Sequence, residues 1–171
     1  QKEVIGGFFR KENTNFYTSA INIKTGHFHD KRNLVPFGEF QPFGNLLESF
    51  NDFFNIPNSS LSRGDLNQIK VDWSALICWE LAFNNTFTDR VRGTKYIIHM
   101  SNDKWYGESM PVQHLQHAKA RAVESNKWVA RATLDGISQI ISPRSNESSK
   151  ILDRGEKGSI THEITLNEVD T

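Results

Sequence analysis

The chain has 171 residues, and its 20 Lys and Arg balance its 20 Asp and Glu, so its formal net charge is zero. Hydrophobic residues make up 37% and charged residues 23%, a composition typical of a packed globular domain and not of a disordered chain. The charge balance argues against a general binder of nucleic acid or polyanions, which would carry a basic excess. We therefore expect no nucleic-acid partner.

Neither a membrane helix nor a secretory signal is evident. No stretch approaches the roughly 18 consecutive apolar residues that a bilayer crossing needs. The opening residues, QKEVIGGFFRKE, lack both an initiating Met and the apolar core of a signal peptide. We expect the chain to be the internal part of a longer protein. Its single cysteine, Cys78, excludes an internal disulfide and a multi-cysteine metal site.

The first half of the chain predicts a hairpin, a loop and a helix. Val4–Phe9 and Asn15–Lys24 are rich in β-forming residues and are separated by a short polar stretch, as in a hairpin. Gly26–Phe43 contains repeated Gly and Pro and predicts a structured loop. Apolar residues at helical spacing predict a helix over Asn45–Phe54, which Pro57 would end.

The middle of the chain alternates strand and helix. Val71–Cys78 reads as a buried strand that runs straight into the cysteine, and a helix is expected from Glu80 to about Gly93. Lys95–Ser101 predicts another short apolar strand. This alternation is typical of an α/β layered domain.

The last part of the chain predicts one strong helix and several strands. A loop leads through Pro111 into the helix, which carries small residues on one face that allow close approach to a sheet. Trp128–Ser142 predicts two strands joined by a turn at Asp135-Gly136, and short strands are expected around Ile151 and over Ile160–Leu166. We interpret residues 1–171 as a single domain.

Cys78 is the strongest candidate for chemistry, because the run Ala75-Leu76-Ile77-Cys78-Trp79-Glu80 places it where a strand gives way to a helix. A thiol at a helix N-terminus lies near unpaired backbone N–H groups, which favour the thiolate. The same groups can hold the oxyanion that forms when a thiolate attacks a carbonyl. The alternative is an inert buried cysteine, which is the commoner case.

A second candidate is the loop KRNLVPFGEF, which places Lys31 and Glu39 eight residues apart on a backbone stiffened by Pro and Gly. A fixed ammonium can stabilise the negative charge of a tetrahedral intermediate, and a glutamate can orient it or move protons. The alternative is a solvated Lys and Glu on a surface loop.

Taken together, an ordered set of segments from about Gly6 to about Ile141 resembles the nitrilase superfamily. The form Leu-Val-Pro-Phe-Gly-Glu of the lysine loop resembles the apolipoprotein N-acyltransferase family, and Ser101–Ser109 resembles that family's Asn-Asp-x-Trp-Phe-Gly loop. The other matching segments are Ser62–Gly64, Ile77–Glu80, Gln113–Ala118, Arg121–Glu124, Arg131–Thr133 and Gly136–Ser138.

The resemblance implies an αββα sandwich of the nitrilase type and a Glu-Lys-Cys catalytic set. By that analogy Cys78 attacks an acyl carbonyl and forms a thioester, while Lys31 and the backbone N–H of Trp79 stabilise the oxyanion. Glu39 would be a second, essential glutamate that supports the site. Glu80 would shape the pocket beside the nucleophile.

The resemblance also implies the substrates and the cellular location. The acyl donor would be a membrane phospholipid, and the acceptor the α-amino group of a diacylglyceryl-modified cysteine in an apolipoprotein. The enzyme would belong to the bacterial inner membrane, with its catalytic domain facing the periplasm. No cofactor is expected.

The chain departs from the family pattern in several places. The family's general-base glutamate and its membrane-spanning region lie upstream of Gly6, so we expect residues 1–171 alone to be inactive. Trp79 stands where Tyr is commoner, and Ser142–Asn146 is longer and more polar than the family's turn.

Aromatic residues gather in and after the lysine loop, and Phe is frequent in the chain, with 12 residues. Phe37, Phe40 and Phe43 could pack in the core, or they could bind an acyl chain or rest against lipid. We assign Phe37 and Phe40 to substrate binding, together with Trp105 of the Asn-Asp-x-Trp loop.

Other functions remain open at this point. His114 and His117, one helical turn apart, and the alternating His27 and His29 lack the further ligands of a diagnostic metal site, so none is expected. A Cys-His hydrolase has no family signature around Cys78. The remaining alternatives are a soluble carbon–nitrogen hydrolase acting on a small amide, and a non-catalytic binding module that retains the fold.

Overall fold

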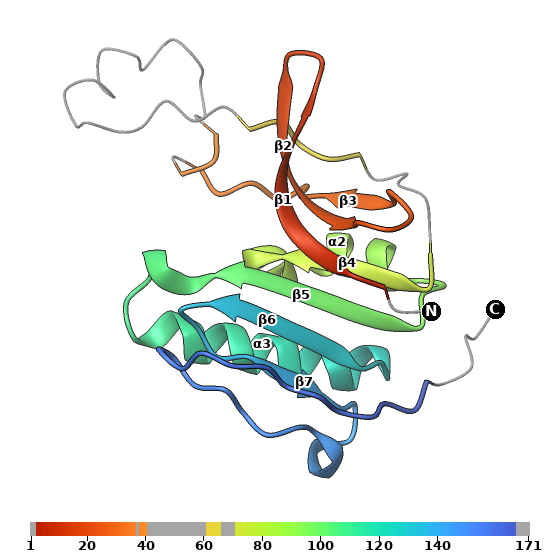
Figure 1. The fold of residues 1–171 in the computed structure, drawn as a ribbon, viewed down its shortest axis with the longest axis vertical. Helices are drawn as coiled ribbons and strands as arrows, with labels where there is room; N and C mark the ends of the chain where they lie inside the picture. The colour runs from red at the N-terminus through yellow and green to blue at the C-terminus, as the bar shows by residue number, and fades with distance from the viewer. Residues whose placement is uncertain (1–2, 37, 41–60, 66–70, 167–171) are drawn as a thin grey trace. The chain divides into compact units, whose positions relative to one another are not determined.

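The computed structural model describes residues 3–36, 38–40, 61–65 and 71–166. These residues belong to two compact units, residues 1–65 and 66–171, and each unit contains its own sheet (Figure 1).

The first unit is built on an antiparallel sheet in the order β1-β2-β3. The predicted hairpin is confirmed, with β1 at Ile5–Glu12 and β2 at Asn15–Asn22. Asn13 adopts a positive φ of 53° in the turn between them, a conformation that asparagine tolerates better than most residues.

The loop predicted over Gly26–Phe43 is wrong at one point, because Phe28–Asp30 forms the short strand β3 beside β2. Gly26, with a φ of +74°, donates its N–H to the carbonyl of Asn22 and turns the chain back toward β2. The Gly and Pro residues thus flank the strand and leave its ladder intact. The helix predicted over Asn45–Phe54 lies outside the described residues.

The second unit is built on a sheet in the order β4-β5-β6-β7, in which the first three strands are parallel and β7 is antiparallel to β6. The strands are β4 at Trp73–Ile77, β5 at Tyr96–Asn102, β6 at Val129–Leu134 and β7 at Gln139–Ile141. The predicted strands in these regions are confirmed, and so is the turn at Asp135-Gly136, where Asp135 has a φ of 54°.

Two helices share one core with this sheet. Helix α2 (Asn84–Val91) packs against β4, and α3 (Ser109–Ser125) packs against β6 and β7. The buried face of α3 repeats at helical spacing, as the sequence predicts. Residues that form the core are Leu76, Leu81, Phe87, Val91, Ile97, Leu115, Ala118, Ala122, Val129 and Ile141.

The single helix predicted from Glu80 is wrong, although its end near Gly93 is confirmed. A 3₁₀ helix, η2 (Cys78–Ala82), comes first, Phe83 is extended, and only then does α2 begin. The chain leaves β4 through Cys78, whose φ is positive, and the carboxylate of Glu80 bonds back to the N–H of Ile77. That tight first turn ends before an α-helix can propagate.

The strand expected over Ile160–Leu166 is also wrong, and around Ile151 there is only an isolated bridge between Ser138 and Leu152. The later segment is attached by side chains instead of a ladder. Trp128 Nε1 donates to the carbonyl of Thr165 at 2.9 Å, and His162 Nε2 lies 2.8 Å from the carbonyl oxygen of Glu147.

The register of the second sheet divides its helix-facing side into an apolar and a polar half. Ile97 of β5 pairs with Val129 of β6, and two residues further along both strands His99 pairs with Arg131. Side chains two residues apart point to the same face. The polar pair therefore lies toward the carboxyl ends of the parallel strands, the end at which Cys78 follows β4.

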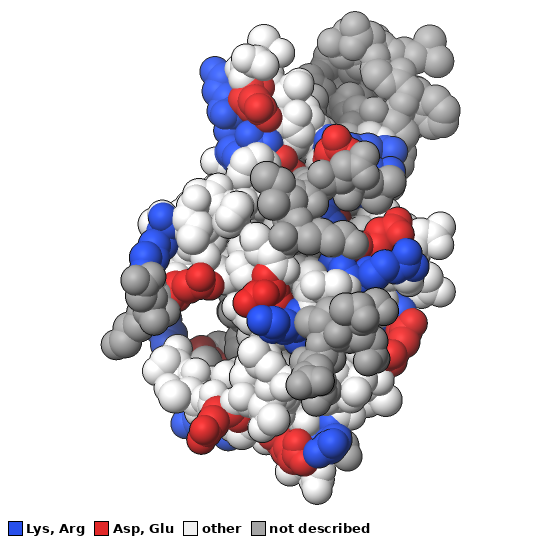
Figure 2. Space-filling view, turned by 90° about the vertical axis from the view of Figure 1, so that its right-hand side faces the viewer, with Lys and Arg blue, Asp and Glu red and all other residues white. Residues whose placement is uncertain are grey.

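Acidic and basic side chains are interspersed over the described part of the face shown in Figure 2, in keeping with the balanced charge of the sequence. Among the described residues, no helix has both the length and the apolar character needed to cross a bilayer.

The tight contact between α3 and the sheet gives a first prediction. Ala118 is fully buried and Ala120, on the same helix, is exposed. Ala118→Leu should lower the free energy of unfolding by about 1–3 kcal/mol, because no space exists for the added isopropyl group. Ala120→Leu should change it by less than about 0.5 kcal/mol. Urea denaturation of both variants measures the difference, and equal stabilities would contradict this packing.

Candidate active site

The backbone of Cys78 is strained, and two hydrogen bonds hold it there. Its φ of 57° places a non-glycine residue in the left-handed region, which costs on the order of 1–2 kcal/mol. On one side the N–H of Ile77 donates to Glu80 Oε2 at 2.9 Å, and Glu80 is fully buried. On the other side His99 Nε2 lies 2.9 Å from the carbonyl oxygen of Cys78. Strained residues of this kind are characteristic of nucleophile elbows.

The hydrogen bonds of His99 fix its tautomer. Arg131 Nη1 lies 2.6 Å from His99 Nδ1. A guanidinium can only donate, so Nδ1 must accept and the ring proton must sit on Nε2. The Nε2–H then donates to the carbonyl of Cys78. His99 thereby links Arg131 of β6 to the backbone of Cys78.

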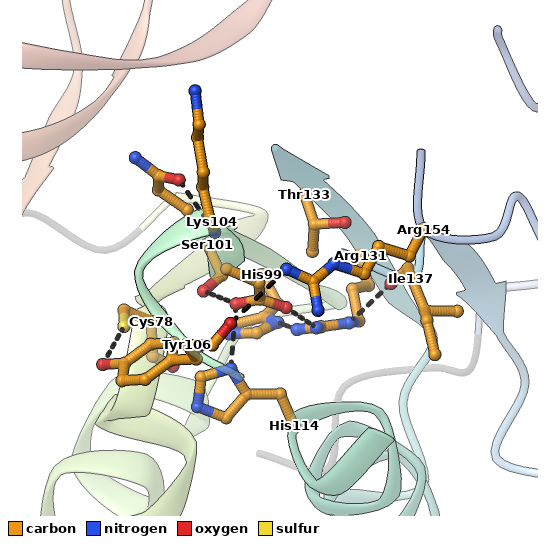
Figure 3. Close-up of polar contacts among 12 residues, drawn as sticks. Cys78, His99, Ser101, Lys104, Tyr106, His114, Arg131, Thr133, Ile137 and Arg154 are labelled. Carbon is orange, nitrogen blue, oxygen red and sulfur yellow. Dashed lines mark hydrogen bonds and ion pairs between the residues drawn. The ribbon is translucent and has the colours of Figure 1, made fainter. Parts of the chain in front are cut away.

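Arg131 is the centre of the network drawn in Figure 3. Besides His99, its Nη2 donates to Asp103 Oδ2 at 2.8 Å and its Nε donates to the carbonyl of Ile137 at 2.9 Å. Asp103 begins the 3₁₀ helix η3 (Asp103–Trp105) just after β5. The parallel register of β5 and β6 brings these side chains together from distant parts of the sequence.

The second carboxylate oxygen of Asp103, Oδ1, has two hydrogen-bond donors. Oδ1 accepts a short hydrogen bond from the hydroxyl of Ser101 and a bond of 3.0 Å from Nδ1 of His114 on α3. Gly136 closes the remaining side, since a Cβ there would lie 2.4 Å from Asp103 Oδ2. Only a glycine fits at this place in the β6–β7 turn.

Burial and charge set the protonation states of this network. Burial, and then the charge of Arg131, lowers the pKa of His99 to about 3, so this histidine is neutral at physiological pH. Burial alone would raise the pKa of Asp103, but hydrogen bonds from His114 and Ser101 outweigh it and bring that pKa down to about 2. Burial lowers the pKa of Arg131, and Asp103 opposes that effect.

The thiol of Cys78 is half-buried, and it faces a phenol. Tyr106 Oη lies 3.8 Å from Cys78 Sγ, as Figure 3 shows. Arg121 of α3 forms hydrogen bonds to the turn after Cys78. Its Nε donates to the carbonyl of Leu81 at 2.7 Å, and its Nη2 donates to Asn84 Oδ1 at 2.6 Å.

In the first unit the predicted lysine and glutamate form a close pair. Lys31 Nζ lies 2.7 Å from both oxygens of Glu39, and Lys31 is only 1% exposed. Glu39 Oε2 also accepts the N–H of Val35 at 2.8 Å. A solvated surface pair, the alternative considered above, does not describe this lysine.

Gly64 supports the same loop. Its N–H donates to the carbonyl of Lys31 at 2.9 Å, and a Cβ at Gly64 would lie 2.4 Å from the carbonyl oxygen of Asp30. The segment Ser62–Gly64, identified from the sequence, therefore packs directly on the strand end that carries the lysine.

The remaining predicted site residues lie as follows. Trp79 packs edge-on against Phe83, with ring centroids 4.9 Å apart, and Phe40 stacks under the guanidinium of Arg63 at 5.1 Å. Phe37 and Phe43, and the side chain of Trp105, lie outside the described part of the chain. Lys31 and Glu39 belong to the first unit and Cys78 to the second.

Sequence reasoning missed the polar network beneath Cys78. His99, Arg131 and Asp103 were not singled out, although polar residues inside otherwise apolar strands were visible at His99 and Arg131. His114 was considered only as a metal ligand. Within the described residues, no group of three or more His, Cys, Asp and Glu side chains is arranged to hold a metal ion.

The Cys-His alternative finds no support in this geometry. His99 uses both ring nitrogens for Arg131 and the Cys78 carbonyl, and His114 Nδ1 is bonded to Asp103. His114 Nε2 is buried without a hydrogen-bond partner, so neither nitrogen of that ring contacts Cys78 Sγ.

The sequence profile of the carbon–nitrogen hydrolase family matches residues 2–171. The chain belongs to this family. Solved structures with the same fold include a carbon–nitrogen hydrolase superfamily protein from Xanthomonas campestris, with a TM-score of 0.62 and 13% identity over 91% of this chain and 60% of that one. Nit3 of Saccharomyces cerevisiae has a TM-score of 0.64 and 17% identity over 91% of this chain and 57% of that one. The predicted α/β fold class of the nitrilase type is confirmed.

Relatives of higher identity to this chain are named apolipoprotein N-acyltransferase. Those from Pasteurella multocida and Shewanella oneidensis are 36% and 34% identical, over 93% and 95% of this chain. The Vibrio vulnificus protein is 33% identical over 84% of it. The matched regions cover 31%, 36% and 32% of those relatives, so the chain spans about a third of their length.

The neutral His99 predicts a pH dependence for the stability of this protein. Its pKa of about 3 in the folded chain lies below the ordinary 6.5, so the unfolded chain takes up a proton first as the pH falls. The contribution of the neutral His99 to the free energy of unfolding is fully present above about pH 6.5 and is lost as the pH falls toward about 3. From about pH 7 to about pH 4.5 the free energy of unfolding should fall by on the order of 3 kcal/mol.

Urea denaturation at several pH values measures this loss. His99→Gln should flatten the slope, whereas His117→Gln, on an exposed face of α3, should leave it unchanged. Stopping at about pH 4.5 keeps the experiment above the range in which Asp103 begins to contribute. Parallel curves for the two variants would contradict a buried neutral His99.

Proposed function

We propose that the protein is an apolipoprotein N-acyltransferase in which Cys78 is the acyl-accepting nucleophile. The observation that carries the proposal is the strained backbone of Cys78 at the end of β4, held by Glu80 and His99, in a chain whose relatives bear that name. A backbone strained at one cysteine and fixed from both sides is the arrangement expected of a nucleophile and has no value for an inert thiol.

The proposed reaction has two steps. The general base takes the proton of the Cys78 thiol, and the thiolate attacks the ester carbonyl of a phospholipid. A C–S bond forms, and the ester C–O bond breaks as the base returns that proton to the oxygen of the leaving lysophospholipid. The α-amino group of a diacylglyceryl-cysteine then attacks the thioester. A C–N bond forms, the C–S bond breaks, the amine loses a proton, and the thiolate is regenerated.

Lys31 and the backbone N–H of Trp79 stabilise the oxyanion in both steps. The burial of Lys31 supports this role, because an ammonium withdrawn from water interacts strongly with a developing negative charge. Both carboxylate oxygens of Glu39 accept hydrogen bonds from that ammonium, and the N–H of Val35 holds Glu39 in place. Glu39 therefore orients the lysine.

The other predicted residues serve the substrate. Glu80 holds the elbow and shapes the pocket beside Cys78, which its bond to Ile77 supports. Trp79, Phe37, Phe40 and Trp105 provide apolar surface for the acyl chain.

The general-base glutamate comes from outside these 171 residues, as the family resemblance implies, and the matched relatives are about three times as long as the chain. The region upstream also carries the contact with the membrane. The enzyme works in the bacterial inner membrane with this part facing the periplasm, and residues 1–171 form one domain that lacks turnover by itself.

The first test looks for the acyl-enzyme. The full-length protein, incubated with phospholipid vesicles, should gain the mass of one acyl chain on the peptide that carries Cys78, and hydroxylamine should remove it. A diacylglyceryl-cysteine peptide should then become N-acylated. Cys78→Ser should lose turnover by about 10⁴-fold or more, in line with the removal of a catalytic nucleophile, and residues 1–171 alone should show no turnover.

The outcome of that test separates the alternatives. Hydrolysis of small amides without acylation by phospholipid would identify a soluble carbon–nitrogen hydrolase instead. Absence of both reactions in the full-length protein would favour a binding module. Acyl transfer by residues 1–171 alone would overturn the assignment of the base to the upstream region.

The lysine pair gives a further prediction. Glu39→Gln removes the charge that fixes Lys31, so kcat for acyl transfer should fall by about 10²-fold while KM for the lipid changes little. Glu163→Gln makes the same chemical change at an exposed position and should leave both constants unaltered. A kcat for Glu39→Gln within about twofold of the unmodified enzyme would rule out the orienting role.

A further inference from the structure

The hydroxyl of Tyr106 is the hydrogen-bonding partner that Cys78 Sγ has among the described residues of its unit. The distance between Oη and Sγ is 3.8 Å, within the range of a hydrogen bond to sulfur. A thiol could donate to the phenol or accept from it. A thiolate has no proton and can only accept, so the phenol must then be the donor.

Tyr106 reaches this position because η3 and α3 both fix it. Its N–H donates to the carbonyl of Asp103 at 3.1 Å, which closes the 3₁₀ turn after β5. Its ring packs edge-on against His114, with centroids 5.7 Å apart, and His114 is anchored to Asp103. The carbonyl of Tyr106 also accepts a bond of 3.4 Å from Arg154. The phenol therefore contacts the same group of hydrogen-bonded side chains that holds the backbone of Cys78.

We propose that Tyr106 is a catalytic residue whose hydroxyl donates a hydrogen bond to the thiolate of Cys78 and so enlarges the fraction of enzyme that is ready to attack. The proposal rests on the proposed function in one respect, that Cys78 is the nucleophile. In the segment that resembles the family's Asn-Asp-x-Trp-Phe-Gly loop, Tyr106 takes the phenylalanine position, so this hydroxyl is a feature of the present chain.

The other charged and titratable groups around Cys78 in this unit act elsewhere. Glu80 bonds to the N–H of Ile77, His99 bonds to the carbonyl of Cys78, and Asp103 binds Arg131 and His114. These groups fix the backbone of the nucleophile, and the guanidinium of Arg131 adds favourable positive charge nearby. The phenol differs from them in that it contacts the sulfur itself.

The test is alkylation of Cys78 by iodoacetamide over a range of pH, followed by mass spectrometry of the peptide that carries this cysteine. Tyr106→Phe keeps the ring and its contact with His114 and removes only the hydroxyl. The pH of half-maximal alkylation should rise by about one unit, the shift that one hydrogen bond to a charged group produces. The limiting rate at high pH and the urea midpoint should stay close to those of the unmodified protein.

Tyr17→Phe in β2 is the matched control, and it should leave the alkylation profile in place. Superimposed profiles for Tyr106→Phe and the unmodified protein would overturn the proposal, and so would an equal shift in Tyr17→Phe. Alkylation needs no acyl donor, so its result is independent of the proposed function. A shifted profile in a protein without acyl transfer would keep the role of Tyr106 and reject only the reaction.

Discussion

A guanidinium withdrawn from water needs hydrogen-bond acceptors and a counter-charge, and the second unit supplies both to Arg131. Asp103 neutralises the charge, the carbonyl of Ile137 takes one N–H, and His99 takes another. Removal of Asp103 would leave a buried charge without its counter-charge, which costs several kcal/mol. Strands β5 and β6, the β6–β7 turn and the start of η3 are therefore fixed relative to one another by polar contacts as well as by their ladder.

The same requirement extends to the backbone of Cys78. Because Arg131 occupies Nδ1 of His99, the opposite nitrogen must carry the proton that holds the Cys78 carbonyl. The hydrogen bond from the N–H of Ile77 to the carboxylate of Glu80 holds the backbone on the other side of Cys78. The left-handed conformation of Cys78 is thus maintained by its surroundings, and the local sequence alone would not adopt it.

The sequence predicted those parts of the fold that depend on local pattern. A buried apolar run into Cys78, small residues along α3 and a turn at Asp135-Gly136 are all visible along the chain, and so is the spacing of Lys31 and Glu39. The polar network could not be predicted in this way, because its members meet only through the register of separate strands. The break after η2 depends on the backbone of one residue, and the short strand β3 on a partner in β2.

The hydrogen bonds of His99 and Arg131 also have a consequence for proton transfer. Both nitrogens of His99 are engaged, and Arg131 holds its protons, so neither of these two side chains offers a vacant lone pair. Asp103, with a pKa of about 2, does not take up a proton at neutral pH. His99 and Arg131 therefore hold the backbone of Cys78 in place but do not accept a proton from it. A proton that leaves the thiol of Cys78 therefore passes to neither His99 nor Arg131.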